Sequence, residues 1–250
     1  MGTNCERVGM SNNHHVVKAV HAAWEHEPRI NLHTHPVTIS YDNGVLTLEG
    51  EVQDIAAKKL CMELAIVVPG VTGIVDRLHV TPAIRIGDGA ILTAVRDVLL
   101  QEPALQNCGV RVRNKGKIET IRESATPNSG IIELSVNDGV VLLDDHVPSL
   151  AKKRLTGVLA WWVPGSRDVI NGMAVEPPEE DNDEELLDTV RLILEKDPFV
   201  NADQIRVRVK NSVVTLEGVV INDVQRRAVE NDAWYIFGVD KVINKLQIQA

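Results

Sequence analysis

Large aromatic side chains are scarce in this sequence of 250 residues, where phenylalanine, tryptophan and tyrosine together make up 3%. One hydrophobic core of this size normally contains more large rings, whereas several small cores can be filled by valine, isoleucine, leucine and alanine. The frequent valines favour β-sheet, because β-branched side chains pack well on a pleated surface. The composition therefore favours several small domains over one large domain.

Cysteine and long apolar runs are also scarce. The three cysteines are Cys5, Cys61 and Cys108, and no two of them have CxxC spacing. An odd number of cysteines without this spacing favours reduced thiols over disulfides or a metal site. No run approaches the ~18 apolar residues that a transmembrane helix requires, and the first fifteen residues lack the apolar segment of a secretory signal. We therefore expect a cytoplasmic protein, or a periplasmic one if a signal peptide was removed.

Basic residues are outnumbered, 26 to 35, which gives a net charge of −9. This balance argues against nucleic acid as a partner, since phosphate contacts need clustered lysine and arginine. The sequence contains no GxSxG, HExxH, Walker or EF-hand pattern. Seven of the eight histidines lie in the first 79 residues, and their spacing fits surface residues better than a zinc site. We expect no enzymatic activity, no cofactor and no metal.

A short pattern occurs three times along the chain. Two β-branched runs are separated by a tight-turn dipeptide, Asn43-Gly44, Asp138-Gly139 or Asn211-Ser212, and such a turn between alternating runs predicts a β-hairpin. A glycine in a second shared string follows 20 residues after the end of each hairpin string. The hairpin strings are 43–50, 138–145 and 211–218, and the second strings are 68–71, 163–166 and 236–239.

Helices are expected on both sides of each hairpin. Upstream, apolar residues recur at helical spacing, and each run ends at an acidic residue followed by proline, which disfavours the α conformation before it. Downstream, Cys61, Leu64 and Val68 lie on one face of a second expected helix. The upstream helices are expected over residues 16–27, 90–102 and 184–197.

Each unit thus has the order helix, strand, strand, helix, strand, and with its repeated strings it resembles the BON domain. The resemblance covers three tandem copies and implies an α+β fold of αββαβ modules, each a three-stranded mixed sheet with two helices on one face. Asp145, Ser166 and Ser212 depart from the repeated pattern. The expected modules are residues 13–82, 88–176 and 182–250.

The middle module carries about twenty additional residues, expected as an inserted loop over about 114–130. The segment is polar, so we expect it to be exposed and to contribute little to the core, as a longer hairpin arm or a mobile loop. A functional loop is the alternative, because long loops frequently carry function.

The second helices share basic and aromatic positions that could contact a surface or a partner. Counted along the helix, Trp161 and Trp234 point away from the side that faces the sheet. Either these rings are exposed for external binding, or they pack between modules of the same chain. The candidate contact residues are Lys152, Lys153, Arg154, Trp161, Trp162, Arg226, Arg227, Trp234 and Tyr235.

The resemblance implies a non-enzymatic binding protein that associates with a phospholipid surface or an envelope partner, commonly in osmotic stress. A cytoplasmic small-ligand or cation-binding protein is one alternative, and an adaptor that holds a protein partner is another. The expected partners are therefore a membrane phospholipid surface or a protein, without nucleic acid and without a transmembrane segment.

Overall fold

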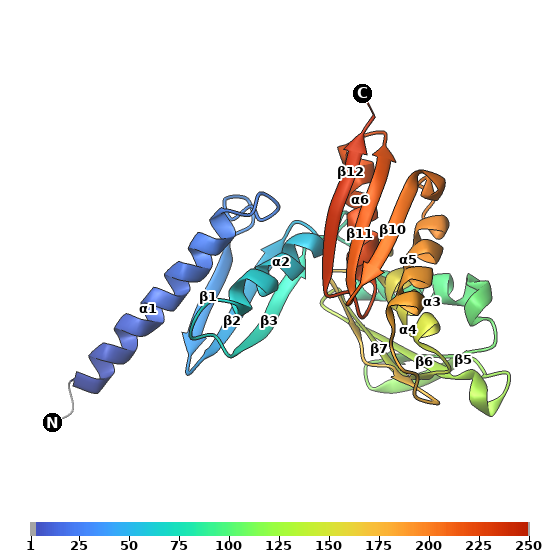
Figure 1. Ribbon diagram of the computed structural model, residues 1–250. Helices are drawn as coiled ribbons and strands as arrows, with labels where there is room; N and C mark the ends of the chain where they lie inside the picture. The colour runs from blue at the N-terminus through green and yellow to red at the C-terminus, as the bar shows by residue number, and fades with distance from the viewer. Residues whose placement is uncertain (1–3, 250) are drawn as a thin grey trace. The chain divides into compact units, whose positions relative to one another are not determined.

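The computed structural model describes the backbone of residues 4–249 and the side chains of residues 13–249. It divides the chain into two compact units, Met1–Thr81 and Pro82–Ala250, which we describe separately (Figure 1). The first unit contains one mixed sheet and the second contains two. The α+β class expected from the sequence is confirmed.

The first unit contains module 1, a three-stranded sheet with strand order β1-β2-β3. The central strand is antiparallel to β1 and parallel to β3. At the hairpin turn, Asn43 and Gly44 both have positive φ, as the Asn-Gly dipeptide predicts. The elements of module 1 are α1 (Asn4–Glu25), β1 (Val37–Asp42), β2 (Val45–Val52), α2 (Ile55–Ile66) and β3 (Gly73–Val80).

The core of module 1 lies between its sheet and its two helices. Leu46, Leu48 and Leu78 from the sheet are fully buried. Trp24 of α1 is also fully buried, and its indole Nε1 donates a hydrogen bond to the main-chain oxygen of Cys61 on α2 (3.0 Å). One large ring therefore joins the two helices. In the described residues α1 extends from Asn4, well before the expected start at Val16.

Module 2 has a larger sheet than expected, with strand order β5-β4-β6-β7-β8 and β9 beside β7. Two short strands, β8 and β9, take the place of one final strand. Between them, Gly172 donates to the main-chain oxygen of Leu143, and Met173 is fully buried. The elements are α3 (Asp88–Gln101), η1 (Pro103–Leu105), β4 (Gly109–Asn114), β5 (Lys117–Arg122), η2 (Pro127–Ser129), β6 (Ile131–Asn137), β7 (Val140–Val147), α4 (Leu150–Trp161), β8 (Asp168–Asn171) and β9 (Ala174–Val175).

The additional residues of module 2 form a β-hairpin rather than a loop without secondary structure. β4 runs parallel to β6 and extends the sheet, and β5 pairs with β4. Val110 and Val112 of β4 are buried, while the residues around the turn at Lys115 and Gly116 are exposed. The valine alternation that builds β4 begins before residue 114, where the insertion was expected to start.

Module 3 repeats the simple arrangement, with strand order β10-β11-β12. As in module 1, the central strand is antiparallel to the first strand and parallel to the last. Ser212 has a φ of 59°, so it adopts the left-handed conformation of the glycine that it replaces in the hairpin. The elements are α5 (Asp183–Lys196), η3 (Ala202–Gln204), β10 (Ile205–Lys210), β11 (Val213–Val220), α6 (Asp223–Tyr235) and β12 (Lys241–Ile248).

Modules 2 and 3 pack against each other within the second unit through their helices. α4 contacts both α5 and α6, and Figure 1 shows α4 beside α5 between the two sheets. Each module keeps its own sheet, and the helix layers meet. Among the helices of the described residues, none is long and apolar enough to cross a membrane.

Candidate functional site

The aromatic residues singled out from the sequence lie mainly where α4 of module 2 meets α6 of module 3. The Trp161 ring stacks on the Tyr235 ring, with centroids 5.0 Å apart and an angle of 19° between the planes. Trp162 Nε1 donates a hydrogen bond to Asp232 Oδ1 (2.8 Å). Trp234 is 2% exposed. Trp161 and Trp162 of module 2 therefore contact module 3, and Trp234 is buried.

Two basic residues of α4 take part in the same contact. Arg154 is fully buried, and its Nε donates to the main-chain oxygen of Phe237 (2.9 Å) while its Nη2 pairs with Asp181. The Lys153 ammonium lies over the Phe237 ring, 4.3 Å from its centroid, in a cation–π geometry. Burial lowers the pKa of Lys153. We call this set of contacts between α4 and module 3 the inter-module seam.

The remaining candidates lie outside the seam. Lys152 Nζ is 3.9 Å from Cys108 Sγ within module 2. Arg226 forms an ion pair with Asp223 on the first turn of α6 (2.6 Å), and Arg227 is exposed. Of the nine candidate residues, Arg154 and Trp234 are buried, Arg227 is exposed and the other six are half-buried. An external partner for any of them stays a prediction.

The inter-module seam contains a buried carboxyl group, that of Asp232, whose pKa is raised. Burial raises the pKa of Asp232 to about 8, against the opposing effect of the Trp162 hydrogen bond and with a further rise from the negative charge of Asp197. Asp232 Oδ2 is buried without a hydrogen-bond donor. A protonated, neutral carboxyl group is therefore the form that this environment favours near neutral pH.

Module 3 exposes three large apolar side chains that the sequence reading did not single out. Phe199, Ile221 and Val224 are 79%, 63% and 69% exposed. They lie around Gln225, whose Nε2 donates to the main-chain oxygen of Phe199 (2.8 Å) and whose Oε1 accepts from the main-chain N–H of Ile221 (2.9 Å). We call these three side chains the apolar tip.

The other two modules have no apolar tip at the equivalent positions. The strands β2, β7 and β11 and the proline that follows each first helix align the three copies. Phe199 then corresponds to arginine or alanine, Ile221 to glutamine or proline, and Val224 to alanine in both. The equivalents are Arg29, Gln53 and Ala56 in module 1, and Ala104, Pro148 and Ala151 in module 2. This difference between copies was readable in the sequence and could have indicated the tip.

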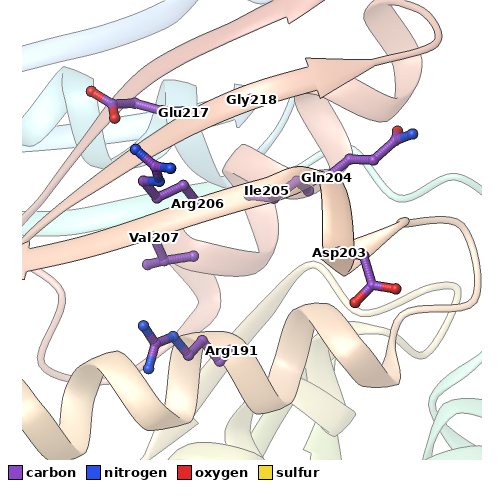
Figure 2. Close-up of a pocket in the computed structure, with 8 residues that line it drawn as sticks. All are labelled: Arg191, Asp203, Gln204, Ile205, Arg206, Val207, Glu217 and Gly218. Atoms are coloured by element: carbon purple, nitrogen blue, oxygen red, sulfur yellow. The ribbon is translucent and has the colours of Figure 1, made fainter.

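A pocket of about 530 Å³ lies along the start of β10, the first strand of the module 3 sheet. Figure 2 shows Arg206 and Glu217 on one side of β10, with Val207 and Arg191 of α5 on the other. Five consecutive residues, 203–207, contribute to its lining. The pocket is open and combines main-chain groups with charged side chains, which suits a polar or peptide ligand better than a wholly apolar one.

Metal ligands do not gather in the part of the chain with described side chains, where no group of three or more His, Cys, Asp or Glu residues could hold an ion. Burial raises the pKa of Cys61 to about 12, with a smaller contribution from the charge of Asp76. A thiol with this pKa stays protonated near neutral pH and is a poor nucleophile.

Comparison with known proteins identifies the repeated unit. The model of the BON domain matches residues 18–82, 117–177 and 182–250. No curated protein matches the chain. Two solved structures of CdsD, described as a structural protein of the type III secretion system of Chlamydia trachomatis, are 14% identical and cover 94% of this chain and 98% and 92% of their own chains. Their TM-score of 0.24 is too low to support any inference.

Proposed function

Because this chain belongs to the BON domain family, we propose that it is a non-enzymatic binding protein, and that it associates with a phospholipid surface through the apolar tip of module 3. The observation that carries the proposal is the exposure of Phe199, Ile221 and Val224 around one bracing glutamine. Large apolar side chains gathered on an exposed surface are typical of a binding site.

The energetics favour insertion into a lipid interface. Full burial of one side chain of this size is worth about 1.5–3 kcal/mol, so three together supply on the order of 5 kcal/mol. Arg227 is exposed on α6, three residues after Val224, and therefore lies next to it on the helix surface. An arginine beside apolar side chains is suited to anionic headgroups, with the apolar groups below the headgroup level.

The apolar tip is not required for the fold, because two copies of the same module fold with other residues there. Exposed apolar side chains usually give no benefit to a folded domain in water, so their presence in module 3 alone supports a binding role. The glutamine brace supports the same view. Gln53 of module 1 also donates to the main chain of the residue equivalent to Phe199, Arg29, so the loop is held without any apolar cluster.

The test is flotation of the full chain with vesicles of phosphatidylcholine alone and of phosphatidylcholine mixed with phosphatidylglycerol. We expect the parent to float with vesicles and to bind the anionic mixture more strongly. The variant Phe199→Ala/Ile221→Gln/Val224→Ala, which installs residues found in the other modules, should stay with the soluble fraction. Ile118→Gln removes an exposed apolar side chain of β5 instead and should float like the parent.

Two results would contradict the proposal. If the parent does not float with either vesicle, phospholipid association is wrong. If the triple variant floats as well as the parent, association occurs through another surface, and the basic residues Lys152, Arg226 and Arg227 become the next to be substituted.

A further inference from the structure

The chain itself shows how the first hairpin strand of a module can accept another strand. In module 2, β4 lies parallel to β6 and pairs residues 109–112 with residues 131–134. Val110 and Val112 of the added strand are buried. Arg113 of β4 donates to the Glu133 carboxylate of β6 (2.6 Å). The added strand is therefore held by main-chain pairing, apolar side chains on one face and an ion pair on the other.

The equivalent strand of module 3, β10, has no such neighbour. Within residues 4–249, β10 pairs only with β11 and is the edge of its sheet. An edge strand presents unpaired N–H and C=O groups along its free side. The hairpin registers place Ile132 and Ile205 at equivalent positions, opposite Asp145 and Gly218 respectively. Residues 131–134, which pair with β4, therefore correspond to residues 204–207.

Those four residues are among the eight that line the pocket of about 530 Å³, together with Arg191, Asp203, Glu217 and Gly218. The open space in module 3 thus lies where β4 lies in module 2. Its volume is within the range of roughly 300–1,000 Å³ typical of ligand pockets. β10 thus has an unpaired edge with a pocket beside it, and in module 2 the equivalent edge already holds an added strand, β4. These features together favour an extended peptide segment as the ligand.

The charge at one position of this edge is reversed relative to module 2, although the pocket lining also includes Asp203 and Glu217. Arg206 occupies the position of Glu133, and among the described residues it forms no ion pair. Arg191 of α5 adds a second guanidinium group on the other side of β10 (Figure 2). In module 2, Arg113 of the added strand forms an ion pair with Glu133 of β6. At β10, by the same geometry, a carboxylate of the added strand would meet Arg206.

We propose that the free edge of β10 binds an extended acidic segment of another protein, which adds to the module 3 sheet as a parallel strand. Main-chain hydrogen bonds to residues 204–207 hold the segment. Small apolar side chains face α5, as Val110 and Val112 face α3 in module 2, and an aspartate or glutamate faces Arg206. This site shares no residue with the apolar tip and goes beyond the proposed association with phospholipid.

The test uses two labelled peptides whose binding to the full chain is followed by fluorescence anisotropy. The basic peptide copies residues 109–114, Gly-Val-Arg-Val-Arg-Asn, and the acidic peptide replaces both arginines with glutamate. We expect the acidic peptide to bind at least about tenfold more tightly than the basic one. In the variant Arg206→Glu the preference should reverse, because the charge at β10 then matches that of β6.

Two controls separate strand addition from general charge attraction. Thr38→Glu changes the equivalent exposed position of β1 in module 1 and should leave the acidic peptide's affinity unchanged. An acidic peptide with proline in place of both valines keeps the charge but cannot complete the ladder, and should not bind.

The proposal is overturned if neither peptide binds, if both bind equally, or if the proline peptide binds as well as its parent. It is also overturned if sedimentation shows that the chain dimerises and that Arg206→Glu abolishes the dimer, because the occupant of the edge is then a second copy of this chain. Failure of vesicle flotation has no bearing on these results, so the two proposals are tested independently.

Discussion

Replacing Asp232 with asparagine should stabilise the second unit and remove a pH dependence. Asp232 lies on α6 with its side chain 3% exposed, and it accepts a hydrogen bond from Trp162 of module 2. Burial raises its pKa from 3.8 to about 8. Asparagine has nearly the same shape and keeps the carbonyl oxygen that accepts from Trp162, but it carries no charge at any pH.

The direction of the effect follows from the proton balance. Between the unfolded pKa of 3.8 and the folded pKa of about 8, the folded chain holds a proton on Asp232 that the unfolded chain has lost. The stability that this group contributes is fully present below pH 3.8 and is lost as the pH rises towards 8. Each pH unit in this window costs up to about 1.4 kcal/mol of the free energy of unfolding. Local relaxation of the structure and entry of water make the real cost per pH unit smaller than this limit. We therefore expect the free energy of unfolding to fall by about 2–3 kcal/mol in total over this window.

The assay is urea unfolding of the parent and of Asp232→Asn, followed by tryptophan fluorescence, near pH 4 and near pH 8. We expect the two proteins to have similar free energies of unfolding at about pH 4, and the variant to be more stable by about 2 kcal/mol or more at about pH 8. Asp240→Asn, which changes an exposed carboxylate of the same module, should behave like the parent. A variant that is less stable than the parent at the higher pH, or equally pH-dependent, would refute the reasoning.

Three further substitutions test other contacts. Arg154→Ala removes a buried guanidinium that joins α4 to Phe237 and Asp181. In urea unfolding it should lower the free energy of unfolding of the second unit by about 2–4 kcal/mol. A change below about 0.5 kcal/mol would contradict a structural role for Arg154. Arg122→Ala removes three hydrogen bonds to main-chain carbonyls at the base of the β4–β5 hairpin and should cost about 2–3 kcal/mol, with faster hydrogen exchange confined to β4 and β5. Cys61, with its pKa raised to about 12, should resist alkylation by iodoacetamide in the folded chain near pH 8 and react after unfolding, as mass spectrometry would show.

The hairpins and helix ends were predictable because local chemistry determines them. Asn43-Gly44 requires positive φ and forms the expected turn. The first helices of modules 2 and 3 end before Glu102 and Asp197, each followed by proline. Asp145, which stands where the other modules have glycine, adopts a φ of 78°, in keeping with the tolerance of aspartate for left-handed backbone.

The environments of charged side chains were not predictable from one sequence, because they depend on which helices meet. Lys58 of α2 and Arg154 of α4 each lie on the second helix of their module, and both are buried. Lys58 pairs with Asp76 (3.1 Å) and donates to the main-chain oxygen of Leu78 (2.7 Å), whereas Arg227 at a neighbouring position is exposed. Helical periodicity places a side chain on a face, but only the packing of whole modules decides what covers that face.

The apolar tip was missed for a different reason. Phe199 lies in a turn and Ile221 in a bend, so neither belongs to a helix or strand whose periodicity could indicate it. Their significance appears only when the three copies are compared position by position and the exposed fractions are known. The insertion of module 2 was expected as a longer hairpin arm or a mobile loop, but it has no counterpart in the other modules, so the repeat could not show that its first strand starts at Gly109.

Hydrogen exchange of the full chain, measured with and without vesicles of phosphatidylcholine mixed with phosphatidylglycerol, tests the central claim most directly. We predict that vesicles slow exchange in the loop that carries Phe199 and in residues 219–227, and leave the inter-module seam unchanged. Unchanged exchange throughout the chain would contradict phospholipid association. Slower exchange confined to other segments, such as α4 and the second half of α6, would place the binding surface at the seam and contradict the assignment to the apolar tip.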